Sequence, residues 1–186
     1  MQYHIAVLRA LTIFLFFAIM GCTPQQKVDS EVLSNSQPNI VFILADDLGY
    51  GEVGCFGQER INTPYIDMLA SQGLRLTSHY SGSPVCAPSR CSLLTGMHTG
   101  HAIVRNNREV GGWGPDEPEG QYPLPAETPT VSRSLQELGY ATGAFGKWGL
   151  GGPKSTGHPS LQGFDYFYGY LCQRVAHNYY PTHLWR

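Results

Sequence analysis

An unbroken apolar run that ends in two adjacent carboxylates constrains the fold of this chain more than any other feature. In PNIVFILADD, residues 38–47, β-branched and aromatic residues precede Asp46 and Asp47. Such a run is typical of a strand buried on both faces, as in a parallel sheet. Because desolvating two carboxylates is costly, the aspartates should follow the strand's C-terminal end. Open α/β sheets bind their ligands at that end.

The segments that follow alternate between helix and strand patterns. The expected elements are a helix over 62–73, a strand over 74–81, a helix over 88–95, a helix over 130–139 and a short strand with a glycine turn over 141–152. Pro64 suits a first helical turn, and Gly73 and Gly139 suit helix ends. This alternation predicts an α/β fold with a largely parallel central sheet flanked by helices.

Composition narrows the class of protein further. The net charge of -2 gives no basic excess, so the chain lacks the electrostatic signature of a nucleic-acid-binding protein. With 22 glycines and 13 prolines, loops are expected to be abundant. Residues 106–128 are polar and rich in both residue types, which predicts a long surface loop.

The N-terminal residues indicate export. Arg9 precedes an apolar run over 10–20 that is too short to span a bilayer, so residues 1–21 are interpreted as a signal peptide. The stretch IMGC resembles a lipoprotein cleavage site, which would leave lipidated Cys22 at the head of a flexible tether, 22–37. Cleavage without lipid is the alternative. We therefore expect a protein of the periplasm or cell surface, anchored to a bacterial membrane through the lipid on Cys22.

Four further cysteines remain after the tether. They are Cys55, Cys86, Cys91 and Cys172. An oxidising compartment would permit two disulfides in three pairings, and none of the spacings resembles a zinc site. Cys86, within SPVCAPSRCSLLTG, is accordingly a buried filler, half of a disulfide or the precursor of a reactive group.

Other candidate residues are ambiguous when taken singly. Asp46 and Asp47 offer hard oxygen ligands for Ca²⁺ or Mg²⁺, or else one caps a turn while the other pairs with a cation. Arg90 follows Cys86 by four residues, which is one helical turn, and could orient a group at position 86. It could equally be a solvated arginine.

Three motifs in order resemble the type I sulfatases. The signature C-x-P-S-R followed by x-x-L-x-T-G is met by Cys86, Pro88, Ser89, Arg90, Leu93, Thr95 and Gly96. PNIVFILADDLGYGE resembles the family's first strand with its metal aspartates, and GKWGLG resembles its lysine turn. The resemblance implies an alkaline-phosphatase-like fold, with residues 38–186 forming the N-terminal part of the catalytic domain.

The resemblance also implies a chemistry. A maturation enzyme would oxidise Cys86 to Cα-formylglycine, and one hydroxyl of the hydrated aldehyde would attack sulfur. Deprotonation of its second hydroxyl would then expel sulfate. Asp46, Asp47 and residue 86 would hold Ca²⁺, with Mg²⁺ as the alternative, while Arg90 would stabilise the modified residue and Lys147 would contact the sulfate group. If so, Cys86 is not a disulfide partner.

Two departures from the family pattern limit this comparison. Gly149 stands where the lysine turn often carries a histidine that serves the modified residue. His177 is the candidate to replace it; His177 and His183 can also be read as surface histidines or as rings packed among aromatic residues. In addition, no Asp-Asn pair follows Lys147. We therefore expect the N-terminal portion of a longer enzyme, inactive by itself.

The expected function is hydrolysis of sulfate monoesters on a sulfated carbohydrate or aryl sulfate. One alternative is a phosphoester or phosphonate hydrolase, which shares the scaffold and metal edge. Another is an inactive fragment. A third is a non-catalytic lipoprotein that binds sulfated glycans through the basic side chains of Arg90, Arg105, Arg108 and Lys147.

Overall fold

The computed structural model describes residues 37–111 and 119–186. The chain divides into two units, Met1–Leu44 and Ala45–Arg186. The expected signal peptide, 1–21, and nearly all of the expected tether, 22–37, lie outside the described residues. Within the described part of the chain, no helix has both the length and the apolar character needed to cross a membrane.

The expected buried strand at the start of the domain is not formed. Residues 37–44, the described part of the first unit, have no strand assignment, and the side chains of Val41 and Ile43 are 83% and 82% exposed. The prediction of a buried strand was wrong because β propensity resides in the side chains, whereas a strand also needs a hydrogen-bonded neighbour. No described strand pairs with this segment.

A parallel pair of strands forms the sheet of the second unit. Strand β1 (Gly143–Lys147) pairs with β2 (Tyr166–Tyr170), with Gly143 opposite Tyr166 and Lys147 opposite Tyr170. Backbone hydrogen bonds continue past the strand ends, from Trp148 N–H to the Tyr170 carbonyl at 2.8 Å. This confirms the short strand expected in 141–152 and the parallel pairing. Lys147 is thus held at the C-terminal edge of the sheet.

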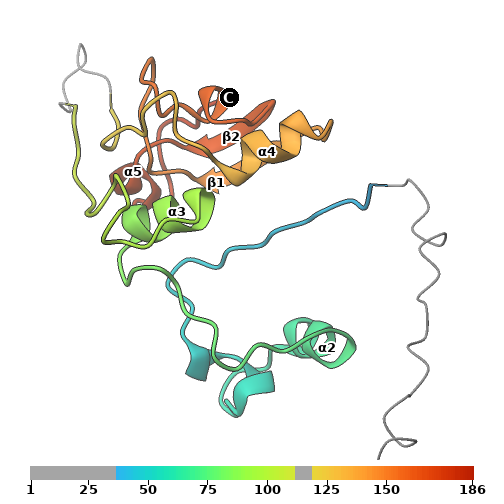
Figure 1. Ribbon diagram of the computed structural model, residues 1–186. Coiled ribbons are helices and arrows are strands. Elements are labelled where there is room, and N and C mark those ends of the chain that lie inside the picture. The colour runs from blue at the N-terminus through green and yellow to red at the C-terminus, as the bar shows by residue number, and fades with distance from the viewer. Residues whose placement is uncertain (1–36, 112–118) are drawn as a thin grey trace, which may run out of the picture. The chain divides into compact units, whose positions relative to one another are not determined.

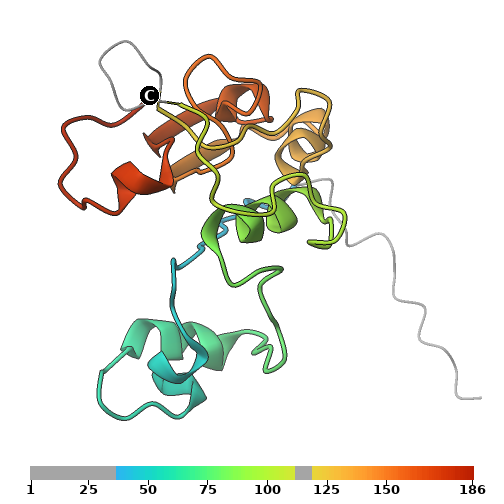
Figure 2. The ribbon, with the colours of Figure 1, turned by 90° about the vertical axis from the view of Figure 1, so that its left-hand side faces the viewer.

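Helices surround this pair of strands. Helix α3 (Cys86–Thr95), α4 (Val131–Glu137) and α5 (Gln173–Ala176) lie around β1 and β2 in both ribbon views (Figures 1 and 2). The buried core joins residues of the helices, the strands and the intervening loops. Its members are Ala87, Cys91, Ala102, Val104, Leu124, Trp148, Leu150, Phe167 and Leu171. The motif-bearing helix α3 therefore contributes directly to the core.

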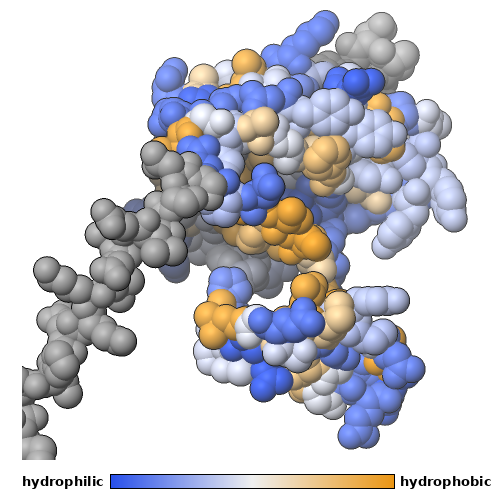
Figure 3. Space-filling view, turned by 90° about the vertical axis from the view of Figure 1, so that its right-hand side faces the viewer, coloured by the Kyte–Doolittle hydropathy of each residue, from blue (hydrophilic) through white to orange (hydrophobic). Residues whose placement is uncertain are grey.

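Helix α2 (Pro64–Gln72) follows the two 3-10 turns η2 (Tyr50–Glu52) and η3 (Gly54–Phe56). It begins after Thr63 and ends at Gly73, as the sequence predicts. Thr63 Oγ1 accepts a hydrogen bond from Gly54 N–H, and Asp67 accepts one from Cys55 N–H, which ties α2 to η3. Its apolar face is not buried: α2 has no buried residue, and Figure 3 shows hydrophobic side chains exposed on the surface.

Two other expectations need correction. Residues 74–81 form turns and irregular backbone instead of a strand, and Leu74 and Tyr80 are largely exposed, because no described strand lies beside them to complete a ladder. The loop over 106–128 is not wholly superficial, since Gln121 and Leu124 are buried. Leu124 N–H donates to the Leu150 carbonyl at 2.9 Å, which draws this part of the loop inward. Residues 112–118 lie outside the described part.

Candidate active site

Cys86 lies at the first position of helix α3. The motif that contains it supplies its own helix boundaries: Pro88 fits the first turn, and Gly96 ends the helix in a left-handed conformation with φ of 69°. The helix begins two residues earlier than the sequence predicted, and so includes Cys86. Arg90 consequently projects from the next turn of the same helix.

Asn107 fixes the start of this helix from a distant loop. The residue before the helix, Val85, has no side chain that can accept a hydrogen bond, and the structure shows no side-chain cap from it. Instead, Asn107 Oδ1 accepts a hydrogen bond from Ala87 N–H at 2.8 Å. The sequence did not identify Asn107 as this partner. Its only indication was that Val85, at the N-cap position, has an apolar side chain, so the cap had to come from elsewhere.

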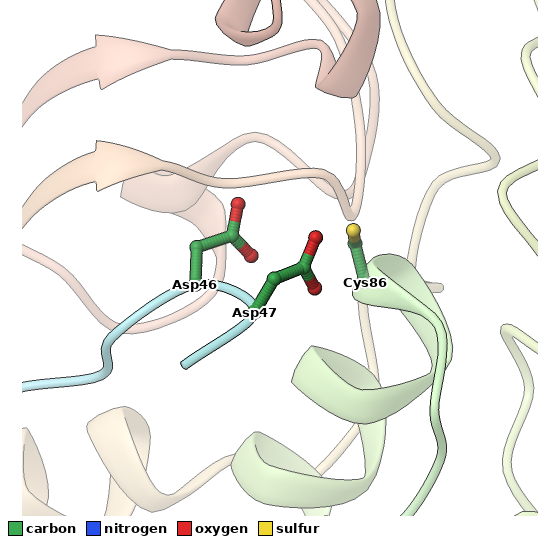
Figure 4. A group of neighbouring side chains, drawn as sticks. All are labelled: Asp46, Asp47 and Cys86. Atoms are coloured by element: carbon green, nitrogen blue, oxygen red, sulfur yellow. The ribbon is translucent and has the colours of Figure 1, made fainter. Parts of the chain in front are cut away.

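The two aspartates lie next to Cys86 (Figure 4). One ligand atom from each of Asp46, Asp47 and Cys86 lies within 4.8 Å of the others. Asp47 has a φ of 57°, a left-handed conformation that aspartate tolerates better than most residues. The turn at 46–47 thereby directs both carboxylates toward the start of α3.

Lys147 links the aspartates, the cysteine and a histidine. Its Nζ lies 2.5 Å from Asp46 Oδ2, 3.4 Å from Cys86 Sγ and 3.3 Å from His177 Nε2, and its side chain is only 7% exposed. An ammonium group has three donors and no acceptor, so each proton has one partner. When Lys147 is charged, His177 Nε2 must accept, which places the imidazole proton on Nδ1.

Arg90 adds a second positive charge. Its Nη2 lies 3.3 Å from Asp46 Oδ1, and its Nη1 donates to the Lys147 carbonyl. Its Nε is buried and has no hydrogen-bond partner among the described residues. Partial burial raises the pKa of Asp46, but the hydrogen bond and charge of Lys147, together with Arg90, outweigh this effect and hold the pKa below its ordinary value.

The remaining predicted candidates are placed as follows. His177 ends α5 and contacts Lys147, whereas His183 lies elsewhere, with Nε2 3.4 Å from Glu119 Oε1 and its ring edge-on to Trp185. The structure thus brings only His177 to the predicted site. Gly149 lies two residues beyond Lys147 with a φ of 82°. All four described cysteines are free thiols.

The donor set fits a hard divalent cation in part. Two carboxylates offer oxygen ligands of the kind that Ca²⁺ and Mg²⁺ prefer, while the Cys86 thiol is a soft donor that suits neither. Oxidation of that side chain to an oxygen-bearing group would make the three donors chemically uniform. Ca²⁺ takes six to eight oxygen ligands, so these three positions supply part of a coordination shell.

Taken together, the charges of this site suit an anionic ligand beside a cation. An acidic pair, two buried or half-buried cations and the Cys86 thiol meet at the carboxyl edge of a parallel sheet, where open α/β sheets bind their ligands. The class is therefore an α/β protein with a charged site at the C-terminal end of a sheet strand, suited to a cation and an anionic ligand.

Comparison with known proteins identifies the family. The sulfatase family model matches residues 38–184, and the chain belongs to the sulfatase family. Human arylsulfatase D is 39% identical over 174 residues, which cover 86% of this chain and 27% of that protein. The N-acetylgalactosamine-6-O-sulfatase of Bacteroides thetaiotaomicron is 42% identical over 158 residues, covering 80% and 29%. The chain thus spans less than a third of the length of these relatives.

Solved structures agree with this assignment. The crystal structure of Ps i-CgsB shares 37% identity with a TM-score of 0.61, and the match covers 74% of this chain and 29% of that one. A Bacteroides thetaiotaomicron structure, described in connection with the metabolism of multiple glycosaminoglycans, gives 36% identity and a TM-score of 0.63 over 73% and 28%. The α/β, alkaline-phosphatase-like fold class predicted from the sequence is confirmed by these neighbours.

Proposed function

We propose that this chain carries part of the active site of a sulfuric ester hydrolase that acts on sulfated glycans, namely the residues that bind and cleave the sulfate ester. The observation that carries the proposal is the position of Lys147, whose Nζ contacts Cys86 Sγ at 3.4 Å and Asp46 Oδ2 at 2.5 Å. A cation beside the reactive position is what an anionic sulfate ester requires, since its charge otherwise repels nucleophiles.

Different residues of this chain would bind the sulfate group, transfer a proton and supply the nucleophile. Lys147 and Arg90 would bind the sulfate oxygens and neutralise their charge, with the orphaned Arg90 Nε as one available donor. His177 would hold or take a proton beside residue 86, since its Nε2 lies 3.3 Å from Lys147 Nζ, which in turn lies 3.4 Å from Cys86 Sγ. The formylglycine made from Cys86 would supply the nucleophilic oxygen.

Asp46 and Asp47 would hold the cation. When bound, Ca²⁺ would supply Lewis-acid charge that favours anionic oxygens near residue 86. Asp46 has a second task, because its salt bridges to Lys147 and Arg90 orient both cations. Its pKa, lowered by these cations against the effect of partial burial, keeps it ionised near neutral pH.

The glycan substrate class is supported by relatives. One similar protein is named N-acetylgalactosamine-6-O-sulfatase, and Ps i-CgsB, 36% identical with a TM-score of 0.61, was solved in complex with k-i-k-neocarrahexaose. Steryl-sulfatase is also among the relatives, at 38% identity for the human protein. Sulfated oligosaccharides and small aryl or steryl sulfates therefore belong in one substrate panel.

Sulfate release by the natural full-length protein tests the proposal. We expect hydrolysis of a sulfated oligosaccharide, lost by about a thousandfold or more in C86A, while the thermal unfolding midpoint stays unchanged. The matched control is C91A, which alters the second cysteine of α3, in the core; it should lower stability and retain turnover. Cleavage of phosphate esters in preference to sulfate esters would contradict the proposal, as would binding without hydrolysis.

Export and anchoring belong to the same proposal. We infer that Cys22 carries a lipid and that the protein reaches the periplasm or cell surface, where sulfated polysaccharide fragments arrive; support comes from the apolar run and the IMGC stretch. A clickable fatty acid fed to the source cells should label the wild-type protein and not C22A. A C22A protein that remains labelled and membrane-bound would contradict the lipid anchor.

A further inference from the structure

Gln173 is a buried side chain whose polar atoms are unpaired. The residue is 3% exposed, yet neither Nε2 nor Oε1 has a hydrogen-bond partner among the described residues. Burying an amide without partners is unfavourable, and such groups in native proteins usually bind a water or an ion or have a functional role. The amide of Gln173 thus keeps its hydrogen-bonding capacity unused by the described protein groups.

The position of Gln173 is set by its backbone. Its N–H donates to Gln121 Oε1 at 3.3 Å, and Gln121 is itself 1% exposed. The sheet pairing also extends almost to it, since Gly149 N–H donates to the Leu171 carbonyl at 3.1 Å. The first residue of α5 is thus held beside the end of β1.

The amide occupies the space that a side chain at position 149 would take. A Cβ added to Gly149 would lie 1.6 Å from Gln173 Nε2, and the φ of 82° at Gly149 disfavours any side chain there. Gly149 and Gln173 are therefore sterically complementary. No larger residue fits at 149 unless the glutamine moves.

Gln173 is the first residue of α5 and His177 is its C-cap, and the His177 N–H donates to the Gln173 carbonyl at 3.2 Å, so the two side chains lie one helical turn apart on one face. His177 Nε2 contacts Lys147 Nζ at 3.3 Å, and Lys147 Nζ contacts Cys86 Sγ at 3.4 Å. This face of α5 is consequently turned toward the end of β1, where the cationic groups gather.

We propose that Gln173 is a sulfate-contacting residue, whose amide fills the space left by Gly149 and donates a hydrogen bond from Nε2 to an anionic oxygen of the substrate. This inference rests on the proposed function. A neutral amide neither gains nor loses a proton in the working pH range, so Gln173 contributes binding and orientation, whereas proton transfer is left to groups such as His177.

A merely structural role makes the opposite prediction. If Gln173 only filled volume, methionine of similar size would replace it without functional loss. Methionine would also remove an unpaired buried amide, which is neutral or stabilising for the fold. If Gln173 contacts sulfate, Q173M should bind sulfate more weakly while its stability is unchanged or higher. If Gln173 only fills volume, sulfate affinity should stay the same.

The test uses inorganic sulfate as the probe and the natural full-length protein, in a buffer containing Ca²⁺. Calorimetric titration should show that Q173M binds sulfate about ten- to a hundredfold more weakly than the wild type, as expected for losing one hydrogen bond to a charged group. Its thermal midpoint should be equal or higher. Q173E, which replaces the donor by a negative charge, should bind at least as weakly as Q173M.

Gln162 provides the matched control. It is also fully buried, and its Oε1 has no partner among the described residues, but its Nε2 donates to the carbonyls of Pro125 and Thr156 at 3.1 and 2.8 Å, so its amide donor serves the fold. Q162M should lower the thermal midpoint and leave sulfate affinity unchanged. Wild-type affinity in both Q173M and Q173E would overturn the inference, as would equal weakening in Q162M.

The proposed function is tested separately by turnover of the wild-type protein. If the wild type hydrolyses sulfate esters and Q173M keeps wild-type sulfate affinity, the inference alone fails. If the wild type binds sulfate through Gln173 but hydrolyses no sulfate ester, the proposed function fails and the inference stands. A wild-type protein that binds no sulfate contradicts both.

Discussion

At the scale of single residues, the two adjacent aspartates of the site have different contacts and therefore different roles. Asp46 pairs with Lys147 and Arg90, whereas no ion pair of Asp47 is found among the described residues. Only Asp46 therefore has its negative charge offset by nearby protein cations. The Asp47 carboxylate remains available to a metal ion, and its left-handed backbone points it toward Cys86.

The substitution D47N isolates this role. Asparagine adopts a φ of 57° as readily as aspartate, so the backbone should not be strained. We expect Ca²⁺ affinity, measured by calorimetry, to fall by about tenfold or more, while the thermal midpoint in EDTA stays the same. Unchanged Ca²⁺ binding in D47N would remove Asp47 from the proposed metal site.

At the scale of the secondary-structure elements, Asp165 joins the end of α4 to the starts of both strands. Its carboxylate accepts hydrogen bonds from the Thr142 N–H at 2.8 Å, the Thr142 hydroxyl at 3.0 Å and Gln136 Nε2 at 2.6 Å. The bond from the Thr142 backbone, followed by those from the two side chains, lowers the pKa of Asp165 below 3.8.

This lowered pKa predicts the pH dependence of stability. Because the folded-state pKa lies below the unfolded value, the carboxylate stabilises the fold above pH 3.8 and loses this effect as pH falls through the folded pKa. D165N should therefore have a lower thermal midpoint than the wild type at neutral pH, and the difference should shrink in acid. E137Q, at the exposed end of α4, is the control, with no difference expected. A difference that is independent of pH would contradict this explanation.

The elements that the sequence predicted correctly are those whose signals are local. Thr63 and Gly73 bound α2, and the Thr130 side chain accepts from Arg133 N–H at the start of α4, so these helices follow from neighbouring residues. The strands expected over 39–45 and 74–81 failed because pairing depends on distant segments. The one-turn spacing of Cys86 and Arg90 was predictable because it is local to one helix. The roles of Asn107 and Gln173 depend on contacts with distant segments, so they could be found only from the fold.

At the scale of the whole chain, the apolar segment before the aspartates is exposed and unpaired. Ile40, Val41, Phe42 and Ile43 are all more than half exposed, and extended apolar backbone with free hydrogen-bonding groups is a template for pairing with another chain. The structure shows β1 and β2 paired with each other, and no described strand pairs with this segment.

We therefore expect the 186-residue chain to self-associate through this segment. Val41 and Ile43 lie two residues apart on one face of the extended backbone, so V41K/I43K would place two charges on it. Sedimentation velocity should show large species for the wild-type chain and a smaller fraction for the double variant. The control is L74K/Y80K, which places the same two charges on exposed apolar residues outside the segment. Equal association in both variants would place the contact elsewhere.

The central claim is that position 86 is a processed nucleophile held by Lys147 and the two aspartates. Mass spectrometry of the peptide containing Cys86, isolated from the source organism and treated with an aldehyde-reactive tag, tests it most directly. We expect the thiol to be replaced by a carbonyl oxygen and the tag to be attached at this residue. An unmodified thiol, or a disulfide between Cys86 and Cys91, would contradict it.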